Sequence, residues 1–169
     1  FNKCVSEGLE GIIVKKKNSI YEPGSRNFEW VKLKRAMKSN MSDTVDVVIM
    51  GYYKGKGRLA EVGIGALLVG VWDDADGRFV TIAKVGTGIT DGLWKNIIGT
   101  LNLIKVQKKP SSYYVNKVIY PDVWVEPRVV CEVRADEITR SPVHTCGLDE
   151  KGEGYALRFP RMELFNRDK

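Results

Sequence analysis

Two lysines that flank a leucine could do chemistry in this chain. Lys32 and Lys34 lie in the segment WVKLK. On a strand, residues two apart project from the same face, so both ammonium groups would point one way while Val31 and Leu33 point the other. Such a pair suits a phosphate group. Because paired lysines are also common on solvated strand edges, the pair alone leaves both readings open.

A carboxylate in a neighbouring segment favours the phosphate reading. Glu10 begins the segment EGIIVK, whose apolar run predicts another strand of the same sheet. A carboxylate there could hold a divalent metal close to lysines that hold the phosphates bridged by that metal. Arg26 follows the turn between the two strands and adds a fork-shaped donor. Glu10, Arg26, Lys32 and Lys34 therefore predict a site for phosphates and a metal.

Short β-prone runs must position these side chains. Residues 11–14 and 30–33 read as two strands of a hairpin, with a Pro-Gly-Ser turn at 23–25 between them. Residues 37–42 form a polar connector without periodicity. We therefore place a domain boundary here, which divides the chain into residues 1–37 and residues 38–169.

The pattern of residues 38–169 predicts a small barrel. Strands are expected at 45–53, 64–72, 79–85, 127–134 and 155–164. A helix capped by Thr90 or Asp91 should run to about Lys108, with its apolar residues at three-and-four spacing on one buried face. The predicted fold class is mainly β, a five-stranded OB-fold barrel with a helix between strands 3 and 4, preceded by a β-hairpin. A generic small β-barrel stays the alternative.

Composition limits the class of protein. The chain has 169 residues, a hydrophobic content of 43% and a formal net charge of +6, which indicate a globular protein that favours a polyanionic partner. No apolar run is long enough for a membrane span, and the N-terminus lacks a signal pattern. Three cysteines without paired spacing favour a reduced, intracellular protein. His144 and Cys146 lack the further ligands that a zinc site needs.

Several separate segments resemble one family. EGIIVK resembles motif IV and WVKLK motif V of the ATP-dependent DNA ligases, within the nucleotidyltransferase superfamily. DTVDVVIMGYYKGKG resembles their first OB strand and basic turn, and KVGTGITD their K-x-G-T-G segment. ITRSPVHTCG, ALRFPR and the terminal NRDK resemble the last ligase segment with motif VI. The order and extent of these matches resemble the archaeal and eukaryotic replicative type most closely.

The resemblance implies ATP and Mg²⁺ as cofactors and a role for each matching residue. Glu10 would help to bind the catalytic metal, and Arg26, Lys32 and Lys34 would contact ATP or the lysyl-AMP adduct. The motif VI residues Arg167, Asp168 and Lys169 would orient the pyrophosphate leaving group. In the loop after the first barrel strand, Lys54, Lys56 and Arg58 are candidates for contacts to the DNA backbone, with a solvated turn as the equally weighted alternative.

One motif of the family is absent. The nucleophilic lysine of these ligases lies in K-x-D-G, and no such sequence occurs here. The first residue is Phe1, so we expect a piece that holds the end of the adenylation domain and the OB domain. This piece should not form lysyl-AMP by itself. Residues 37–42 are the expected hinge for domain closure, and the hairpin without its sheet could pair with another copy along its open edge.

The expected partner is nicked duplex DNA, bound by a monomeric ligase in the cytoplasm, nucleoid or nucleus, with a sliding clamp contacting regions outside this chain. Two other readings stay open. An RNA ligase or RNA-capping nucleotidyltransferase shares motifs IV to VI. A non-catalytic OB module could instead bind single strands on a platform of Tyr52, Tyr53 and Trp72.

Overall fold

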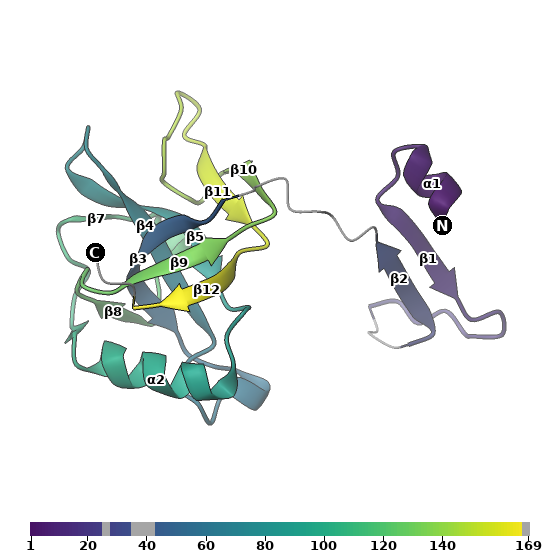
Figure 1. Cartoon of the computed structure of the whole chain (residues 1–169), viewed down its shortest axis with the longest axis horizontal. Coiled ribbons are helices and arrows are strands. Elements are labelled where there is room, and N and C mark those ends of the chain that lie inside the picture. Colours follow the sequence, from purple (N-terminus) through teal and green to yellow (C-terminus); the bar gives the residue numbers. More distant parts are fainter. Residues whose placement is uncertain (25–27, 35–42, 167–169) are drawn as a thin grey trace. The chain divides into compact units, whose positions relative to one another are not determined.

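The structure is a computed structural model that describes residues 1–24, 28–34 and 43–166. The chain divides into two compact units, Phe1–Lys38 and Ser39–Lys169, which Figure 1 draws with the chain coloured from purple to yellow. The predicted boundary after residue 37 and the predicted hinge at 37–42 lie outside the described residues.

The first unit is a short helix followed by a hairpin. Helix α1 (Asn2–Ser6) precedes strands β1 (Gly11–Lys15) and β2 (Trp30–Lys34). The strands pair antiparallel, with Gly11 opposite Lys34 and Ile13 opposite Lys32. The predicted hairpin is therefore confirmed. Its apolar side chains are incompletely covered within the unit: Val31 is 41% exposed and Leu33 44%.

The second unit is built mainly of strands. They are β3 (Val45–Tyr53), β4 (Ala66–Asp73), β5 (Arg78–Val85), β6 (Lys105–Val106), β7 (Tyr113–Tyr114), β8 (Val123–Val125), β9 (Val130–Arg134), β10 (Glu137–Ser141), β11 (Gly154–Arg158) and β12 (Arg161–Phe165). The helical segments are α2 (Asp91–Asn102) and the 3₁₀ turns η1 (Gly57–Leu59) and η2 (Lys117–Ile119).

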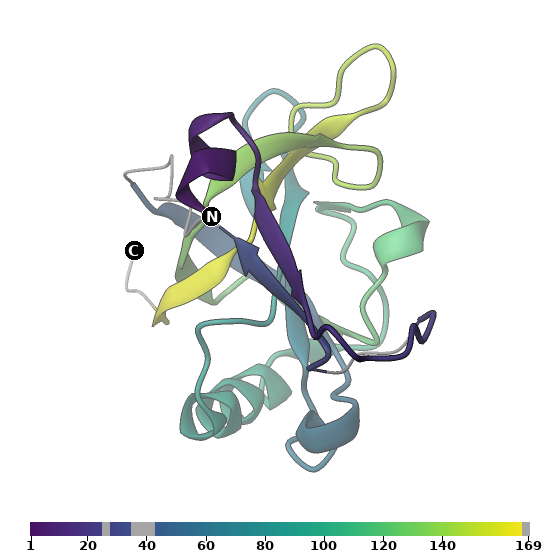
Figure 2. The same cartoon turned by 90° about the vertical axis from the view of Figure 1, so that its right-hand side faces the viewer.

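The sheet of this unit curls into a partly open barrel. Its strand order is β12-β9-β3-β4-β5-β7, with β8 paired to β3 and β6. Thr87, just after β5, forms a parallel bridge with Arg161 of β12, so strands far apart in this order also meet. Figures 1 and 2 show the β10–β11 hairpin and α2 at opposite ends of the barrel. This mainly β arrangement, with a helix between β5 and β9, confirms the predicted OB fold.

The barrel interior is closed at one end by α2. The side chain of Thr90 caps this helix by accepting a hydrogen bond from the backbone N–H of Leu93, at 3.2 Å. Trp94, Ile97 and Leu101 follow at the spacing of one helix face and are at most 1% exposed. They pack with strand residues into the main core. The predicted cap and buried face are both confirmed.

A second apolar cluster lies on the other face of the sheet. Leu68 of β4 belongs to this outer cluster, whereas its neighbours Leu67 and Val69 belong to the main core. Tyr113 and Trp124, from the chain between α2 and β9, cover Leu68 and Met50. Residues that follow α2 in the chain thus cover the outer face of β3 and β4.

Three details of the predicted barrel were wrong. The helix ends at Asn102 rather than near Lys108, because Lys105 and Val106 pair with β8 instead of continuing the helix. The last predicted strand, 155–164, is divided at Phe159 and Pro160 into β11 and β12, which pair with different strands. Strands β7, β8 and β10 were not predicted, and β10 forms a separate hairpin with β11.

None of the helices in the described part of the chain is long and apolar enough to cross a membrane.

Candidate functional site

The hairpin brings the predicted metal ligand and one predicted phosphate ligand together. Glu10 and Lys32 line one hollow, together with Gly11 and the flanking apolar residues of β1 and β2. Lys32 is exposed and stands opposite Ile13. The antiparallel register explains the arrangement, because it sets the beginning of β1 beside the end of β2. A carboxylate and an ammonium group thus share a surface that a phosphate-bound cation could occupy.

Several other predicted residues lie at the limits of the described structure. The backbone of Lys34 pairs with Gly11, but its side chain is not described. Arg26 lies outside the described residues, and so do Arg167, Asp168 and Lys169. Their predicted roles stay predictions.

Lys15 and Lys16, at the end of β1, have local partners. The Nζ atom of Lys15 lies 4.5 Å from the centre of the Trp30 ring. Lys16 forms an ion pair with Glu29 at 3.0 Å. These contacts are exposed and serve the hairpin itself. The described lysines of the hairpin therefore fall into two groups. Lys15 and Lys16 contact the hairpin itself, whereas Lys32 lies near Glu10 in the candidate site.

The loop between β3 and β4 holds two of the predicted DNA contacts on a tightly folded backbone. A Cβ atom at Gly55 would lie 1.9 Å from the carbonyl oxygen of Leu59, so no other residue fits there without a shift of the loop. The backbone N–H of Lys54 donates to Oδ2 of Asp122 at 2.7 Å. The side chains of Lys54 and Lys56 are exposed, and that of Arg58 is not described. The loop can present two cations to a partner.

A larger basic hollow lies between the end of β5 and the β10–β11 hairpin. Its cations are Lys84, Arg140, Arg158 and Arg161, and no Asp or Glu is among the described residues that line it. We call it the basic hollow. The four residues come from β5, β10, β11 and β12. In an OB fold, the loops between strands 1 and 2 and between strands 4 and 5 flank the nucleic-acid face, and β10 and β11 belong to the second of these.

One cation of the basic hollow, Lys84, lies against an aromatic ring. The Nζ atom of Lys84 lies 3.7 Å from the centre of the Tyr53 ring, which is fixed by a hydrogen bond from its hydroxyl to the carbonyl of Ile119 at 2.5 Å. Burial and, secondly, the charge of Asp122 raise the pKa of Tyr53 to about 12, so the phenol stays neutral.

Two arginines of the hollow have acidic neighbours outside it. Arg140 lies 3.6 Å from Asp149, and Arg158 lies 3.7 Å from Glu137. These separations are too long for hydrogen bonds. Arg140 donates from Nη1 to the carbonyl of Glu153 at 3.2 Å, and each guanidinium group has further donors that can reach another ligand.

An aromatic ring projects among these cations. Phe159 is 51% exposed, and its ring centre lies 4.9 Å from Cζ of Arg158. Its φ angle of 51° is in the left-handed region, which a phenylalanine rarely adopts. Exposed aromatic rings in basic grooves are the side chains on which bases of single-stranded nucleic acids commonly stack.

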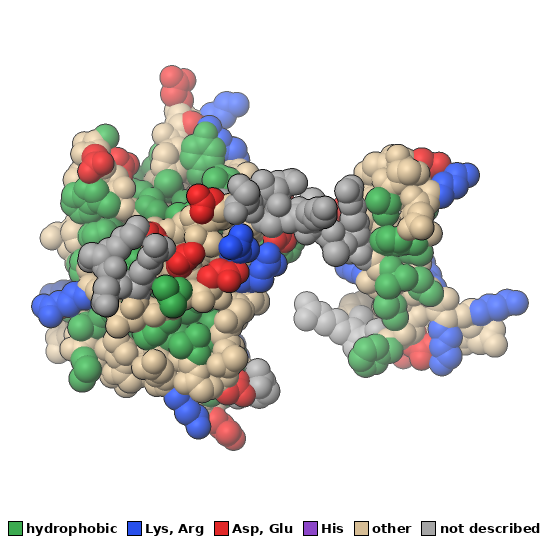
Figure 3. Space-filling model, in the orientation of Figure 1, with side chains coloured by type: hydrophobic (Ala, Val, Ile, Leu, Met, Phe, Trp, Pro, Cys, Tyr) green, Lys and Arg blue, Asp and Glu red, His purple; other side chains and the backbone are tan. Residues whose placement is uncertain are grey.

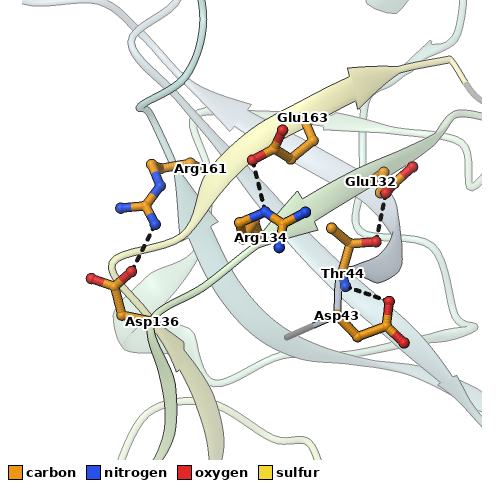
Figure 4. Close-up of polar contacts among 7 residues, drawn as sticks. All are labelled: Asp43, Thr44, Glu132, Arg134, Asp136, Arg161 and Glu163. Atoms are coloured by element: carbon orange, nitrogen blue, oxygen red, sulfur yellow. Dashed lines mark hydrogen bonds and ion pairs between the residues drawn. The ribbon is translucent and has the colours of Figure 1, made fainter. Parts of the chain in front are cut away.

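The face formed by β9 and β12 has a different character. Arg134 pairs with Glu163 at 3.1 Å, and Thr44 donates to Glu132 at 2.5 Å. Figure 4 shows these contacts together with Asp43, Asp136 and Arg161, and Figure 3 shows red and blue side chains side by side over these strands. Carboxylates outnumber guanidinium groups in this set, so these side chains together carry a net negative charge.

The structure also bears on metal binding. No group of three or more His, Cys, Asp or Glu side chains is placed to hold a metal ion in the described ranges. His144 and Cys146 are partly buried, and burial raises the pKa of the Cys146 thiol. Mg²⁺ is commonly held by one or two carboxylates together with substrate phosphates, which is compatible with Glu10 as a single protein ligand.

Comparison with known proteins matches both units to one family. Residues 60–169 match the family model described as ATP dependent DNA ligase C terminal region, and residues 1–34 match the model for the ATP dependent DNA ligase domain. The chain belongs to the ATP-dependent DNA ligases. The resemblance to this family is thereby confirmed, and the first model covers the OB barrel from residue 60 onward, after β3.

Relatives with the same family name match almost the whole chain. A probable DNA ligase of Dictyoglomus thermophilum is 55% identical over 168 residues, which are 99% of this chain and 28% of that ligase. DNA ligase 1 of Methanosarcina acetivorans is 41% identical over 171 residues, 100% of this chain and 29% of the relative. The chain thus spans less than a third of the length of these ligases.

Solved ligase structures share the fold. The ligase domain of LigD from M. tuberculosis has a TM-score of 0.57 and 28% identity, over 100% of this chain and 48% of that one. A mycobacterial DNA ligase D complexed with ATP and MES has a TM-score of 0.53 and 27% identity, over 100% of this chain and 47% of that one.

The basic hollow was missed as a site by reasoning from sequence. Lys84 lies far in sequence from the other three cations, and the packing of β11 against β5 and the bridge between Thr87 and Arg161 bring them together. The signal was present in part, because Lys84 opens KVGTG and Arg158 and Arg161 lie in ALRFPR. Both segments resemble ligase segments, but neither predicts that the two face each other.

Proposed function

We propose that this chain is the part of an ATP-dependent DNA ligase that supplies phosphate contacts, motif VI and DNA contacts for the sealing of nicks in duplex DNA. The match of both units, in order, to the two ligase family models carries the proposal. The shared hollow of Glu10 and Lys32 supports it, because it joins a metal-binding group to a phosphate-binding group.

The reaction has three transfers at phosphorus. A lysine outside this chain attacks the α-phosphate of ATP, so that pyrophosphate leaves and lysyl-AMP forms. The 5′-phosphate of the nick then takes the AMP and releases the lysine. The 3′-hydroxyl finally attacks that 5′-phosphate, loses its proton and expels AMP, which closes the strand. Each step requires alignment and neutralisation of phosphate charge more than covalent chemistry by the protein.

The residues of this chain fit these requirements as follows. Glu10 would hold Mg²⁺, which neutralises phosphate charge when it is bound. Lys32 and Lys34 would bind phosphate oxygens of ATP and of the adenylate, with Arg26 as a further donor. Arg167, Asp168 and Lys169 of motif VI would act on the pyrophosphate leaving group. Because K-x-D-G is absent, this chain by itself would not become adenylated.

DNA would bind across the barrel. Lys84 connects the basic hollow with the predicted contact loop, since it lines the hollow and stacks on Tyr53, which immediately precedes Lys54. We assign phosphate contacts to Lys84, Arg140 and Arg158 and to the loop residues Lys54, Lys56 and Arg58. Phe159 would stack on an exposed base or sugar at the groove.

The decisive experiment is sealing of a nicked duplex by the full-length protein with ATP and Mg²⁺, compared with this chain alone. We expect sealing and transient labelling of the full-length protein by ³²P-AMP, and neither from the chain alone. Sealing of a nicked RNA in preference to DNA, or labelling by GTP instead of ATP, would favour the RNA ligase or capping reading. Labelling of the chain alone would contradict the proposed division of roles.

Neutralising the basic hollow should weaken DNA binding in a salt-dependent way. For the pair of substitutions Lys84→Gln and Arg158→Gln in the full-length protein, the slope of log K against log salt should fall by about 0.9 for each phosphate that the protein no longer neutralises. Anisotropy of a labelled nicked duplex over a salt series measures this slope.

The matched control is Lys95→Gln, which removes an exposed charge on α2, away from the hollow. It should leave the salt slope unchanged. If Lys95→Gln lowers the slope as much as the hollow substitutions do, overall charge rather than the hollow governs binding.

A further inference from the structure

The turn that carries Phe159 is held on one side by Asp136, the residue before β10. The backbone N–H of Asp136 donates to the carbonyl of Arg158 at 3.0 Å. The carboxylate of Asp136 accepts from Nη2 of Arg161 at 2.7 Å, and its side chain is only 16% exposed. Figure 4 shows this ion pair at the start of β12. Asp136 thus ties the residues just before and just after Phe159 and Pro160.

Thr87, which follows β5, forms hydrogen bonds to the same turn from the other side. The hydroxyl of Thr87 donates to the carbonyl of Pro160 at 2.6 Å. The backbone carbonyl of Thr87 accepts from the N–H of Met162 at 3.0 Å. The side chain of Thr87 thus bonds to the turn itself. This bond is separate from the backbone bridge that joins Thr87 to β12.

Gly88 allows this close approach. Its φ angle is +80°, and a Cβ atom there would lie 2.6 Å from the backbone oxygen of Met162 and 2.8 Å from its nitrogen. Backbone atoms cannot move aside as the end of a flexible side chain can. A residue with a side chain at 88 would therefore separate the segment after β5 from β12.

We propose that Thr87 is a positioning residue for DNA recognition, which holds the Phe159–Pro160 turn in the strained conformation that presents the Phe159 ring. The inference rests on the proposed function of the basic hollow. A strained φ persists only where its surroundings hold it, and the hydroxyl of Thr87 supplies one such restraint at the residue next to Phe159. Thr87 itself needs no contact with DNA.

A double-mutant cycle in the full-length protein tests the proposal. Thr87→Val removes the hydroxyl and keeps the shape and the backbone bridge, and should weaken binding to a nicked duplex roughly three- to tenfold, as expected for the loss of one hydrogen bond. Thr87→Ser should restore wild-type binding. In a Phe159→Ala background, Thr87→Val should have no further effect, because the group that it positions is gone.

The outcomes separate this inference from the proposed function. If the hollow substitutions and Phe159→Ala weaken binding but Thr87→Val does not, only the positioning role is wrong. An equal loss from Thr87→Val with and without Phe159 also overturns it, since Thr87 would then act on something else. If the hollow substitutions and Phe159→Ala have no effect, the proposed DNA site fails and the positioning role fails with it.

A second pair of variants tests the backbone approach. Gly88→Ala should weaken binding more than Thr87→Val does, and 2-aminopurine fluorescence at the nick should report weaker stacking. The control is Gly99→Ala on α2, where an added Cβ meets nothing within 4 Å and binding should not change. Wild-type binding and fluorescence by a folded Gly88→Ala protein would contradict the proposed close packing at the turn.

Discussion

Replacing Lys34 by alanine in the full-length protein is expected to lower the rate of nick sealing roughly 100- to 1,000-fold, the range seen when one preorganised electrostatic contact to a reacting centre is removed. Affinity for nicked DNA should change little, because the proposed DNA contacts lie on the barrel. Sealing under single-turnover conditions and anisotropy of the nicked duplex measure the two quantities separately.

Lys17→Ala is the matched control, since it removes an exposed lysine of the same unit that lies beyond the end of β1. It should seal at the wild-type rate. Equal losses of sealing and of DNA affinity in Lys34→Ala would remove the proposed role of Lys34 at the phosphates and would assign it to DNA binding.

The second large effect is on stability. Trp94→Ala should lower the free energy of unfolding by about 3–5 kcal/mol, the usual cost of deleting a buried aromatic side chain. Trp94 is 1% exposed and packs with Ile97 and Leu101 where α2 closes the barrel. Denaturant titration followed by circular dichroism measures the loss.

Leu103→Ala is the control for this substitution. Leu103 is the C-cap of the same helix and is 87% exposed, so its truncation should cost less than about 0.5 kcal/mol. Alanine raises the intrinsic helix propensity at either position, so similar losses from both substitutions would mean that burial in the closed core is not what makes Trp94 important.

The helix shows where periodicity predicts and where it fails. Thr90 and the spacing of Trp94, Ile97 and Leu101 identified the cap and the buried face, because both depend on neighbouring residues. The end of the helix depends on a distant partner: Lys105 pairs with Val125, and Val106 with Trp124. An apolar residue at Ile104 continues the helical spacing but packs on the core from a non-helical backbone.

The candidate sites differ in the same way. Glu10 and Lys32 could be paired from sequence because a hairpin fixes which residues stand near each other. The basic hollow needs the curl of the sheet, since Lys84 and Arg158 approach only when β11 packs against β5. The strained turn at Phe159 could not be expected either, because phenylalanine is a poor choice for a positive φ and marks no turn by itself.

The outer cluster that covers β3 and β4 couples the packing of the barrel to the position of a cation in the basic hollow. Tyr53 packs on the outer cluster with Trp124 and also carries the ammonium group of Lys84 on its ring. Under the proposed contact of Lys84 with DNA phosphates, a change in the packing of that cluster would alter the affinity for DNA by moving the Tyr53 ring on which Lys84 lies. Substitutions among residues that make no contact with DNA would in this way change how tightly the proposed site binds it.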